Sequence, residues 1–176
     1  MNESELLITR LSPRSASLLQ IHGADLREAA PLAARVLGEP NPQHSSVSGP
    51  RAYVIGPTEW LLIDYSLGEV RRQLSQDLGR ALVRVTDLSG AFTSLRIEGA
   101  AARTVLASDI GAPWMSAAGR PGQYARTRLG QIEVVLHCIS TDAFELHVDR
   151  SVVDHLEGWL LAQYEAQSPA DPPVVQ

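Results

Sequence analysis

Two groups of residues in the sequence have types and spacing that could support chemistry. Asp87 and Ser89 stand two positions apart in "VTDLSGAF", and His137, Cys138 and His147 lie in two consecutive segments that alternate like the strands of one hairpin. An acid beside a serine is typical of hydrolases, and a group of histidine and cysteine side chains is typical of zinc sites or thiol nucleophiles. The surrounding sequence has to supply the remaining parts of each site.

Asp87 and Ser89 lack the partners that a hydrolase needs. No histidine lies near them in the sequence, and the serine is not in the G-x-S-x-G turn that exposes a nucleophile. Aspartate and serine side chains commonly bond to backbone groups in turns. We therefore expect both residues to stabilise the sharp turn at Gly90.

The histidines and the cysteine also fail the spacing tests for a metal site. The chain contains no C-x-x-C and no H-x-x-x-H pattern. Neighbouring strand residues point to opposite faces, so His137 and Cys138 cannot easily share a metal. We expect His137 and His147 to be surface or hydrogen-bonded residues and Cys138 to be a small buried apolar residue. The sequence therefore predicts no metal site.

The composition excludes several other classes of protein. All 15 basic residues are arginine, so a Walker lysine and a Schiff-base lysine are excluded, and the net charge of −5 is unfavourable for nucleic-acid binding. The lone glycine of "GAAAR" lacks the dinucleotide-binding G-x-G-x-x-G pattern. No apolar run approaches the roughly 20 residues of a membrane span, and "MNESELLITR" is unlike a signal peptide. We expect a soluble, cytoplasmic protein.

Hydrophobic periodicity predicts two similar series of elements, at about residues 15–87 and 91–165. Each series runs strand, helix, strand, strand, helix, with an additional strand in each half. "LQIHGA" in the first series aligns with "LRIEGA" in the second, and Trp60 falls opposite Phe144. The last helix, "RSVVDHLEGWLLAQY", opens with Ser151 and Asp154 as a capping pair. Trp60 and Trp159 occupy positions typical of a core.

These patterns predict an α+β fold, a pseudo-duplicated split βαβ arrangement. We expect one folded domain at residues 15–165, preceded by an N-terminal segment at 1–14. The Pro-rich end, residues 166–176, is predicted to be a disordered tail.

Three stretches resemble the γ subunit of heterotetrameric sarcosine oxidase: "GPTEWLLI", "VTDLSGAFTSLRIEGAAARTVLASDIGA" and "AFELHVDRSVVDHLEGWL". The resemblance covers roughly residues 15–165, which is nearly all of the predicted folded domain. Its characteristic positions are Trp60, Asp87, Ser89, Gly99 and Ser151. That family is itself similar to the folate-binding aminomethyltransferase (T-protein) of the glycine-cleavage system.

The resemblance implies a hetero-oligomer with α, β and δ subunits, the α subunit being the main contact. It implies FAD, FMN, NAD, tetrahydrofolate and zinc in those partner subunits and no cofactor in this chain. It also implies no catalytic, cofactor-binding or metal-binding residue here.

The aminomethyltransferase pattern places carboxylates after a glycine pair, in the style of "GGIxDD". The corresponding stretch here is "RLGQIEVVLH", in which Val134 and Val135 stand at the positions of the carboxylates. Glu133 is one position earlier, and a one-residue shift in a strand moves a side chain to the opposite face. We therefore expect the carboxylate that would orient the reacting amine to be absent.

The remaining functional signal is a candidate partner surface. Aromatic residues and arginine are enriched at the binding hot spots of protein interfaces. A tryptophan in a loop of small residues, "GAPWMSAAG", can cap the core or anchor a partner, and several arginines follow it. The candidate interface residues are Trp114, Met115, Arg120, Tyr124, Arg126 and Arg128.

The function predicted from the sequence is that of a non-catalytic γ subunit in a flavin-dependent sarcosine oxidase, which demethylates sarcosine oxidatively to glycine. One alternative is the small subunit of an N-methylglutamate dehydrogenase or of another N-methyl amino acid demethylase. Alternatives from other classes are a stand-alone folate-binding protein and a monomeric binding module with an unrelated partner.

Overall fold

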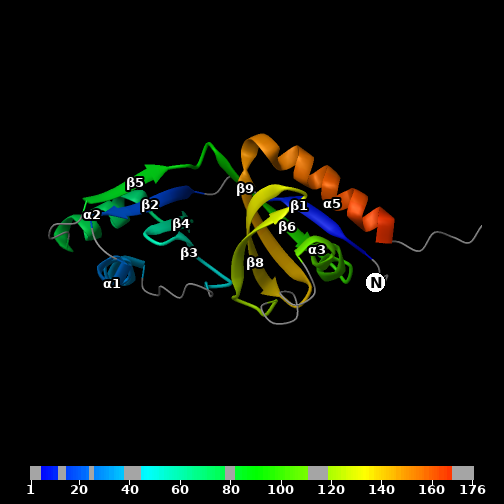
Figure 1. The fold of residues 1–176 in the computed structure, drawn as a ribbon, viewed down its shortest axis with the longest axis horizontal. Coiled ribbons are helices and arrows are strands. Elements are labelled where there is room, and N and C mark those ends of the chain that lie inside the picture. The colour runs from blue at the N-terminus through cyan, green and yellow to red at the C-terminus, as the bar shows by residue number, and fades with distance from the viewer. Residues whose placement is uncertain are drawn as a thin grey trace, which may run out of the picture.

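Two antiparallel β-sheets lie between helices in the computed structural model of the chain (Figure 1). The structure describes residues 5–11, 15–23, 26–37, 45–77, 82–110 and 119–167. This architecture confirms the α+β class that the sequence predicts.

The first sheet is built from one continuous stretch of chain. Its elements are β2 (Ala16–His22), α1 (Leu26–Leu37), β3 (Arg51–Gly56), β4 (Glu59–Ile63), α2 (Leu67–Asp77) and β5 (Leu82–Asp87). The strand order is β3-β4-β2-β5. Strands β2 and β3 both pair antiparallel with β4, so they are parallel to each other and α1 connects them. This arrangement is the predicted split βαβ unit.

The second sheet contains the remaining strands. Its elements are β6 (Phe92–Glu98), α3 (Ala102–Ile110), β7 (Tyr124–Leu129), β8 (Ile132–Ser140), β9 (Ala143–Asp149), the 3₁₀ turn η1 (Arg150–Val152) and α5 (Val153–Gln167). The strand order is β1-β6-β9-β8-β7. Here β6 and β8 are parallel with β9 between them, and α3 lies between β6 and β8 in the chain.

Strand β1 (Leu7–Arg10) comes from the N-terminal segment, which the sequence analysis assigned to neither repeat. It pairs antiparallel with β6 at the edge of the second sheet. Arg10 at its end forms ion pairs with Asp154 and Glu157 of α5. The second sheet is thus completed by residues that precede the first sheet in the chain.

The two sheets have the same strand order when β2, β4, β3 and β5 are equated with β6, β9, β8 and β1. Helices α1 and α2 then correspond to α3 and α5. Strand β7 is an addition at the edge of the second sheet. The topology therefore supports the duplication inferred from the sequence, with the last strand of the second copy supplied by the N-terminus.

The hydrophobic core has three parts. Helices α1 and α2 cover the outer face of the first sheet, where Trp60 is buried as predicted. Helices α3 and α5 cover the outer face of the second sheet, and Trp159 is partly buried there. The inner faces of the two sheets pack on each other through residues that include Leu61, Ile63 and Val135. The alternation of side chains along each strand divides them between these layers.

Gly99 marks the point where β6 turns into α3. Its φ of +114° favours glycine, and a Cβ at this position would collide with the backbone carbonyl of Glu5, just before β1. Gly99 is therefore required both for the turn and for the close approach of the N-terminal strand.

We expect Gly99→Ala to lower the free energy of unfolding by about 1–3 kcal/mol, the usual range for backbone strain of this kind. Thermal unfolding followed by circular dichroism measures the loss. Gly90→Ala is the matched control, since a Cβ at Gly90 meets no atom within 4 Å and its φ is not positive. Equal melting temperatures for the two variants would contradict this assignment.

Candidate functional site

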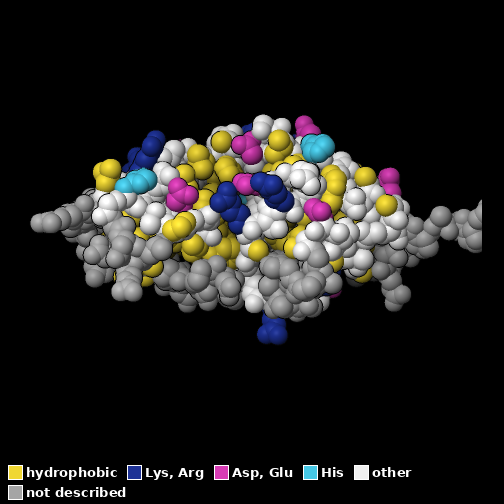
Figure 2. Space-filling view, in the orientation of Figure 1, with side chains coloured by type: hydrophobic (Ala, Val, Ile, Leu, Met, Phe, Trp, Pro, Cys, Tyr) yellow, Lys and Arg dark blue, Asp and Glu magenta, His cyan; other side chains and the backbone are white. Residues whose placement is uncertain are grey.

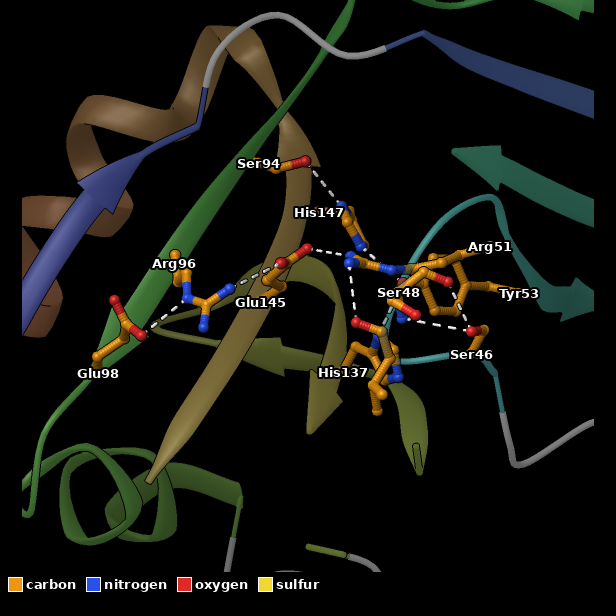
Figure 3. A network of polar contacts seen from close by, with 11 residues as sticks. Ser46, Ser48, Arg51, Tyr53, Ser94, Arg96, Glu98, His137, Glu145 and His147 are labelled. Carbon is orange, nitrogen blue, oxygen red and sulfur yellow. Dashed lines mark hydrogen bonds and ion pairs between the residues drawn. The ribbon is translucent and has the colours of Figure 1, made fainter. Parts of the chain in front are cut away.

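A buried polar network crosses the junction between the two sheets (Figure 3). Arg51 of β3 forms an ion pair with Glu145 of β9, and the two side chains are only 4% and 0% exposed. Arg96 of β6 lies 3.6 Å from the second oxygen of Glu145, and Glu98 accepts from Arg96 at 2.9 Å. The carboxylate of Glu145 thus lies between one arginine of each sheet.

The charge on Arg51 is maintained by its neighbours. Burial disfavours the charged guanidinium, but Tyr53 and Glu145 outweigh this effect and raise the pKa of Arg51. The guanidinium also donates a hydrogen bond to the carbonyl of Val47 at 3.3 Å. A buried ion pair of this kind holds two elements in one relative position, and loss of either partner is costly.

A second chain of hydrogen bonds runs beside the ion pair. The hydroxyl of Tyr53 lies 3.0 Å from Nδ1 of His137 and 2.9 Å from Nε2 of His147. The other nitrogen of His147, Nδ1, lies 2.8 Å from Oγ of Ser94. All four side chains are buried. The prediction of hydrogen-bonded histidines is therefore confirmed for both.

Oγ of Ser94 and Nδ1 of His147 are as close as a nucleophile and its base, but both side chains are inaccessible to a substrate. Ser94 lies on the inner face of β6 and is buried beneath the first sheet. A nucleophilic serine must reach its substrate, and its base must exchange a proton during the reaction. The geometry instead suits a structural connection between the sheets.

The sequence patterns did not indicate Arg51, Tyr53 or Glu145. One signal was present in "AFELHVD", where Glu145 and His147 alternate with large apolar residues in a strand that is buried except at Asp149. Arg51 and Tyr53 alternate in the same way along β3. Alternation shows that such residues share a face, but only the packing of the sheets shows that the two faces meet.

A cavity of about 100 Å³ adjoins this network at the junction of the sheets. Its lining is largely apolar and comes from both sheets; the lining residues are Ile55, Leu61, Phe92, Arg126, Glu133, Val134, Val135 and His147. Since sites for drug-sized ligands and cofactors are typically about 300–1,000 Å³, this cavity is too small for a folate, a flavin or a dinucleotide.

Val134 and Val135 occupy β8 as the sequence predicts, and Glu133 lies on the face opposite to Val134. Residues 133, 135 and 137 share the inner face of β8, so Glu133 lies on the same face as Val135. Its carboxylate accepts from Arg126 at 2.9 Å and lies 3.6 Å from Arg128. Arg126, the largest cause, and Arg128 lower the pKa of Glu133. This carboxylate is held by the two arginines of β7.

Four of the six candidate interface residues lie in the part of the chain that the structure describes. Arg120, Arg126 and Arg128 are exposed, whereas Tyr124 is 5% exposed and its hydroxyl accepts a hydrogen bond from the Val54 N–H at 2.7 Å. Burial raises the pKa of Tyr124. Trp114 and Met115 lie outside the described residues. Tyr124 supports the strand that carries the arginines, and the partner surface itself stays a prediction.

Cys138 is buried among apolar residues of the second sheet, and its side chain points away from that of His137. Burial raises the pKa of its thiol, which disfavours the reactive thiolate. This placement confirms the predicted role as a small core residue. Among the residues that the structure describes, no group of three or more potential ligands is placed to hold a metal ion.

The turn residues Asp87 and Ser89 bond to the backbone. Asp87 accepts from the Ser89 N–H at 2.9 Å, and this hydrogen bond lowers the pKa of Asp87. The Ser89 hydroxyl accepts from the Ala16 N–H at 3.1 Å and so connects the turn to β2. Asp87 acts within the turn as predicted, whereas Ser89 reaches an element far away in the sequence.

The cap of the last helix differs from the prediction. Asp149, two residues earlier than expected, is the capping residue and accepts from both N and Oγ of Ser151. The chain first makes the η1 turn, so the capping position moves from Ser151 to the end of β9. Ser151 is the donor in this cap.

These hydrogen bonds make stability depend on pH. Ser151 lowers the pKa of Asp149, so the bond contributes stability above the unfolded-state pKa of about 3.9 and loses it as the pH falls through the folded-state value. We expect the urea midpoint to fall between pH 5 and pH 3, and Asp149→Asn to reduce this fall. An unchanged pH dependence in Asp149→Asn would show that other carboxyl groups control it.

The chain is an α+β protein whose two inner sheet faces are covered by its own side chains, and its fold resembles that of aminomethyltransferases. The chain is similar to the glycine cleavage system aminomethyltransferase T from Bartonella henselae, with a TM-score of 0.58 and 13% identity over 90% of this chain and 46% of that one. Among the described residues, no helix is both long and apolar enough to cross a membrane.

The chain belongs to the sarcosine oxidase γ subunit family, whose model matches residues 40–167. The fold is also similar to that of a chain of the heterotetrameric sarcosine oxidase from Corynebacterium sp. U-96 in complex with pyrrole 2-carboxylate. That match has a TM-score of 0.76 and 24% identity, and covers 97% of this chain and 89% of that one. No curated protein sequence matches the chain. The family predicted from the sequence is therefore confirmed.

Proposed function

We propose that the chain is a non-catalytic γ subunit of a flavin-dependent sarcosine oxidase, which oxidatively demethylates sarcosine to glycine. Family membership supports the type of complex, and the match to a chain of a heterotetrameric enzyme supports the presence of other subunits. The proposed partners are α, β and δ subunits in the cytoplasm, with the α subunit making the main contact.

One observation carries the non-catalytic part of the proposal. The inner faces of the two sheets are occupied by the chain's own side chains, above all by the Arg51–Glu145 pair and the Tyr53–histidine contacts. The adjoining cavity of about 100 Å³ is several times smaller than a typical cofactor site. We therefore assign FAD, FMN, NAD, tetrahydrofolate and zinc to the partner subunits.

The proposed contact surface lies around β7. Arg120, Arg126 and Arg128 contribute exposed side chains, and Tyr124 holds the strand from below. We include Trp114 and Met115 in this surface, although they lie outside the described residues. Arginine at the edge of a sheet offers a partner several donors in a fixed geometry.

Purification of the tagged chain from its native host tests the assembly. We expect two large subunits and one small subunit to co-purify, together with a flavin absorption spectrum and sarcosine-dependent formation of peroxide. Turnover of another N-methyl amine without peroxide would favour a demethylating dehydrogenase such as N-methylglutamate dehydrogenase. A colourless chain that elutes alone would refute the subunit proposal, and titration with tetrahydrofolate would then test the folate-binding alternative.

Substitution within the assembled complex tests the absence of catalysis. We expect Ser94→Ala to leave kcat unchanged and to lower only the thermal stability, since Ser94 bonds to His147 inside the chain. A nucleophile or a general base would contribute at least about 100-fold to the rate. A loss of kcat of that size in a complex that still assembles would refute the non-catalytic role.

A further inference from the structure

The cavity between the sheets has the size of one side chain. Its volume is about 100 Å³, smaller than the cavity of roughly 150 Å³ that in an engineered protein accepts benzene. Ile55, Leu61, Phe92 and Val135 provide apolar walls, and the cavity is open on one side. Both nitrogens of His147 are engaged with Ser94 and Tyr53, so its ring adds carbon surface to the wall. An aliphatic group fits such a site.

Arg126 and Glu133 line the cavity, and Arg128 lies beside Glu133, so two positive charges and one negative charge are grouped at this point. Arg126 donates to the carbonyl of Ile55 at 2.9 Å and to Glu133 at the same distance, so its position is fixed. Arg128 is 66% exposed and lies 3.6 Å from Glu133, beyond hydrogen-bond distance. Two arginines thus share one carboxylate, which leaves a net positive charge beside the cavity. Figure 2 shows charged side chains of both signs beside hydrophobic surface near the middle of the view.

We infer that this cavity is the anchor site for the large α subunit, which makes the main contact under the proposed function. An aliphatic side chain of that subunit inserts between Ile55 and Val135, and a neighbouring carboxylate of the same subunit pairs with Arg128. The inference rests on the proposed function, because it requires partner subunits. Its physical basis is the form of a hot spot, in which an apolar anchor fills a desolvated pocket beneath a polar rim.

Two variants test the two parts of this contact in the complete complex. Ile55→Trp places additional bulk at the cavity, and Ile55→Val is its control because it leaves the cavity open. Arg128→Glu reverses the charge at the rim. Its matched control is Arg72→Glu on α2, because Arg72 is 67% exposed and also pairs with a glutamate, Glu69.

All four subunits are co-expressed, the flavin-bearing subunit is tagged, and the amount of this chain retained is measured at low and high salt. We expect Ile55→Trp to weaken retention about thirtyfold, as the loss of a hot spot does. Arg128→Glu should weaken it most at low salt and partly recover at high salt, because a like-charge contact is screened by ions. Both controls should be retained like wild type.

The outcomes separate this inference from the proposed function. If the wild-type chain is not retained, the subunit proposal fails and the anchor site fails with it. If wild type, Ile55→Trp and Arg128→Glu are all retained equally, the chain is a subunit but the cavity is not its anchor site. Should Ile55→Trp fail to fold, the salt dependence of Arg128→Glu decides alone, since that side chain is exposed. Self-association that depends on Ile55 would identify a second copy as the occupant and overturn the inference.

Discussion

Replacing Glu145 by glutamine is expected to lower the free energy of unfolding by about 3–5 kcal/mol, the usual cost of removing one partner of a buried ion pair. An amide cannot neutralise the guanidinium of Arg51, which stays inside the protein between the two sheets. Arg96, 3.6 Å from the same carboxylate, loses its neighbour as well. Urea unfolding of the purified protein, followed by circular dichroism, measures the loss.

An exposed ion pair provides the control for this prediction. Glu69→Gln removes the negative charge that pairs with Arg72 on the surface of α2. We expect no measurable change in the free energy of unfolding. Replacing both members of the buried pair, Arg51→Met with Glu145→Leu, should recover most of the stability lost in Glu145→Gln. A Glu145→Gln protein as stable as wild type would show that the pair does not hold the sheets together.

The order of the elements could be predicted because the information lies in short segments. Apolar residues alternate along Ala16–His22 and Phe92–Glu98, and each segment ends at a glycine with positive φ, Gly23 and Gly99. Such signals depend on neighbouring residues alone, and so they are readable in the sequence. The same holds for the burial of Trp60 and Cys138, which face the helices on opposite sides of the molecule.

The connection between the two halves could not be predicted in this way. The Arg51–Glu145 pair joins residues 94 positions apart, and nothing near either residue specifies the other. Strand β1 is short and mostly exposed, so its apolar pattern is weak, and only pairing with β6 defines it. Glu133 lies on the face opposite to Val134, as the sequence predicts, but its pairing with Arg126 across β7 could not be predicted. Contacts between distant elements depend on register and packing, which local patterns leave open.

These connections show how the chain's own side chains fill the space between its two sheets. The faces that pack between the two sheets combine apolar residues with an ion pair and four hydrogen-bonded side chains. Burying polar groups is favourable only where they find partners, as the hydroxyl of Tyr53 and the charged groups of Arg51 and Glu145 do here. The same requirement fixes the relative position of the sheets, and therefore the shape of the surface around β7.

Replacing Tyr53 by phenylalanine should give the second large loss of stability. The single hydroxyl contacts Nδ1 of His137 and Nε2 of His147, so the variant removes two buried hydrogen bonds while keeping the ring. Each buried nitrogen that is left without a hydrogen bond lowers the free energy of unfolding by about 1–3 kcal/mol. Tyr124→Phe is the matched control. The ring of Tyr124 lies 4.9 Å from that of Tyr53, and its hydroxyl accepts a hydrogen bond from the Val54 N–H. We expect Tyr53→Phe to be the more destabilised of the two in urea.

The tautomers of the histidines provide a second test of the same contact. A hydroxyl carries one proton, so Tyr53 can donate to only one of the two imidazoles and must accept from the other if both bonds are formed by neutral rings. NMR of the imidazole nitrogens should therefore find one of the two facing nitrogens protonated and the other not. In Tyr53→Phe this difference should disappear, whereas Tyr124→Phe should preserve it. If the two facing nitrogens have the same protonation state in the wild-type protein, the hydroxyl does not connect both histidines. The loss of stability in Tyr53→Phe should then be no larger than that in Tyr124→Phe.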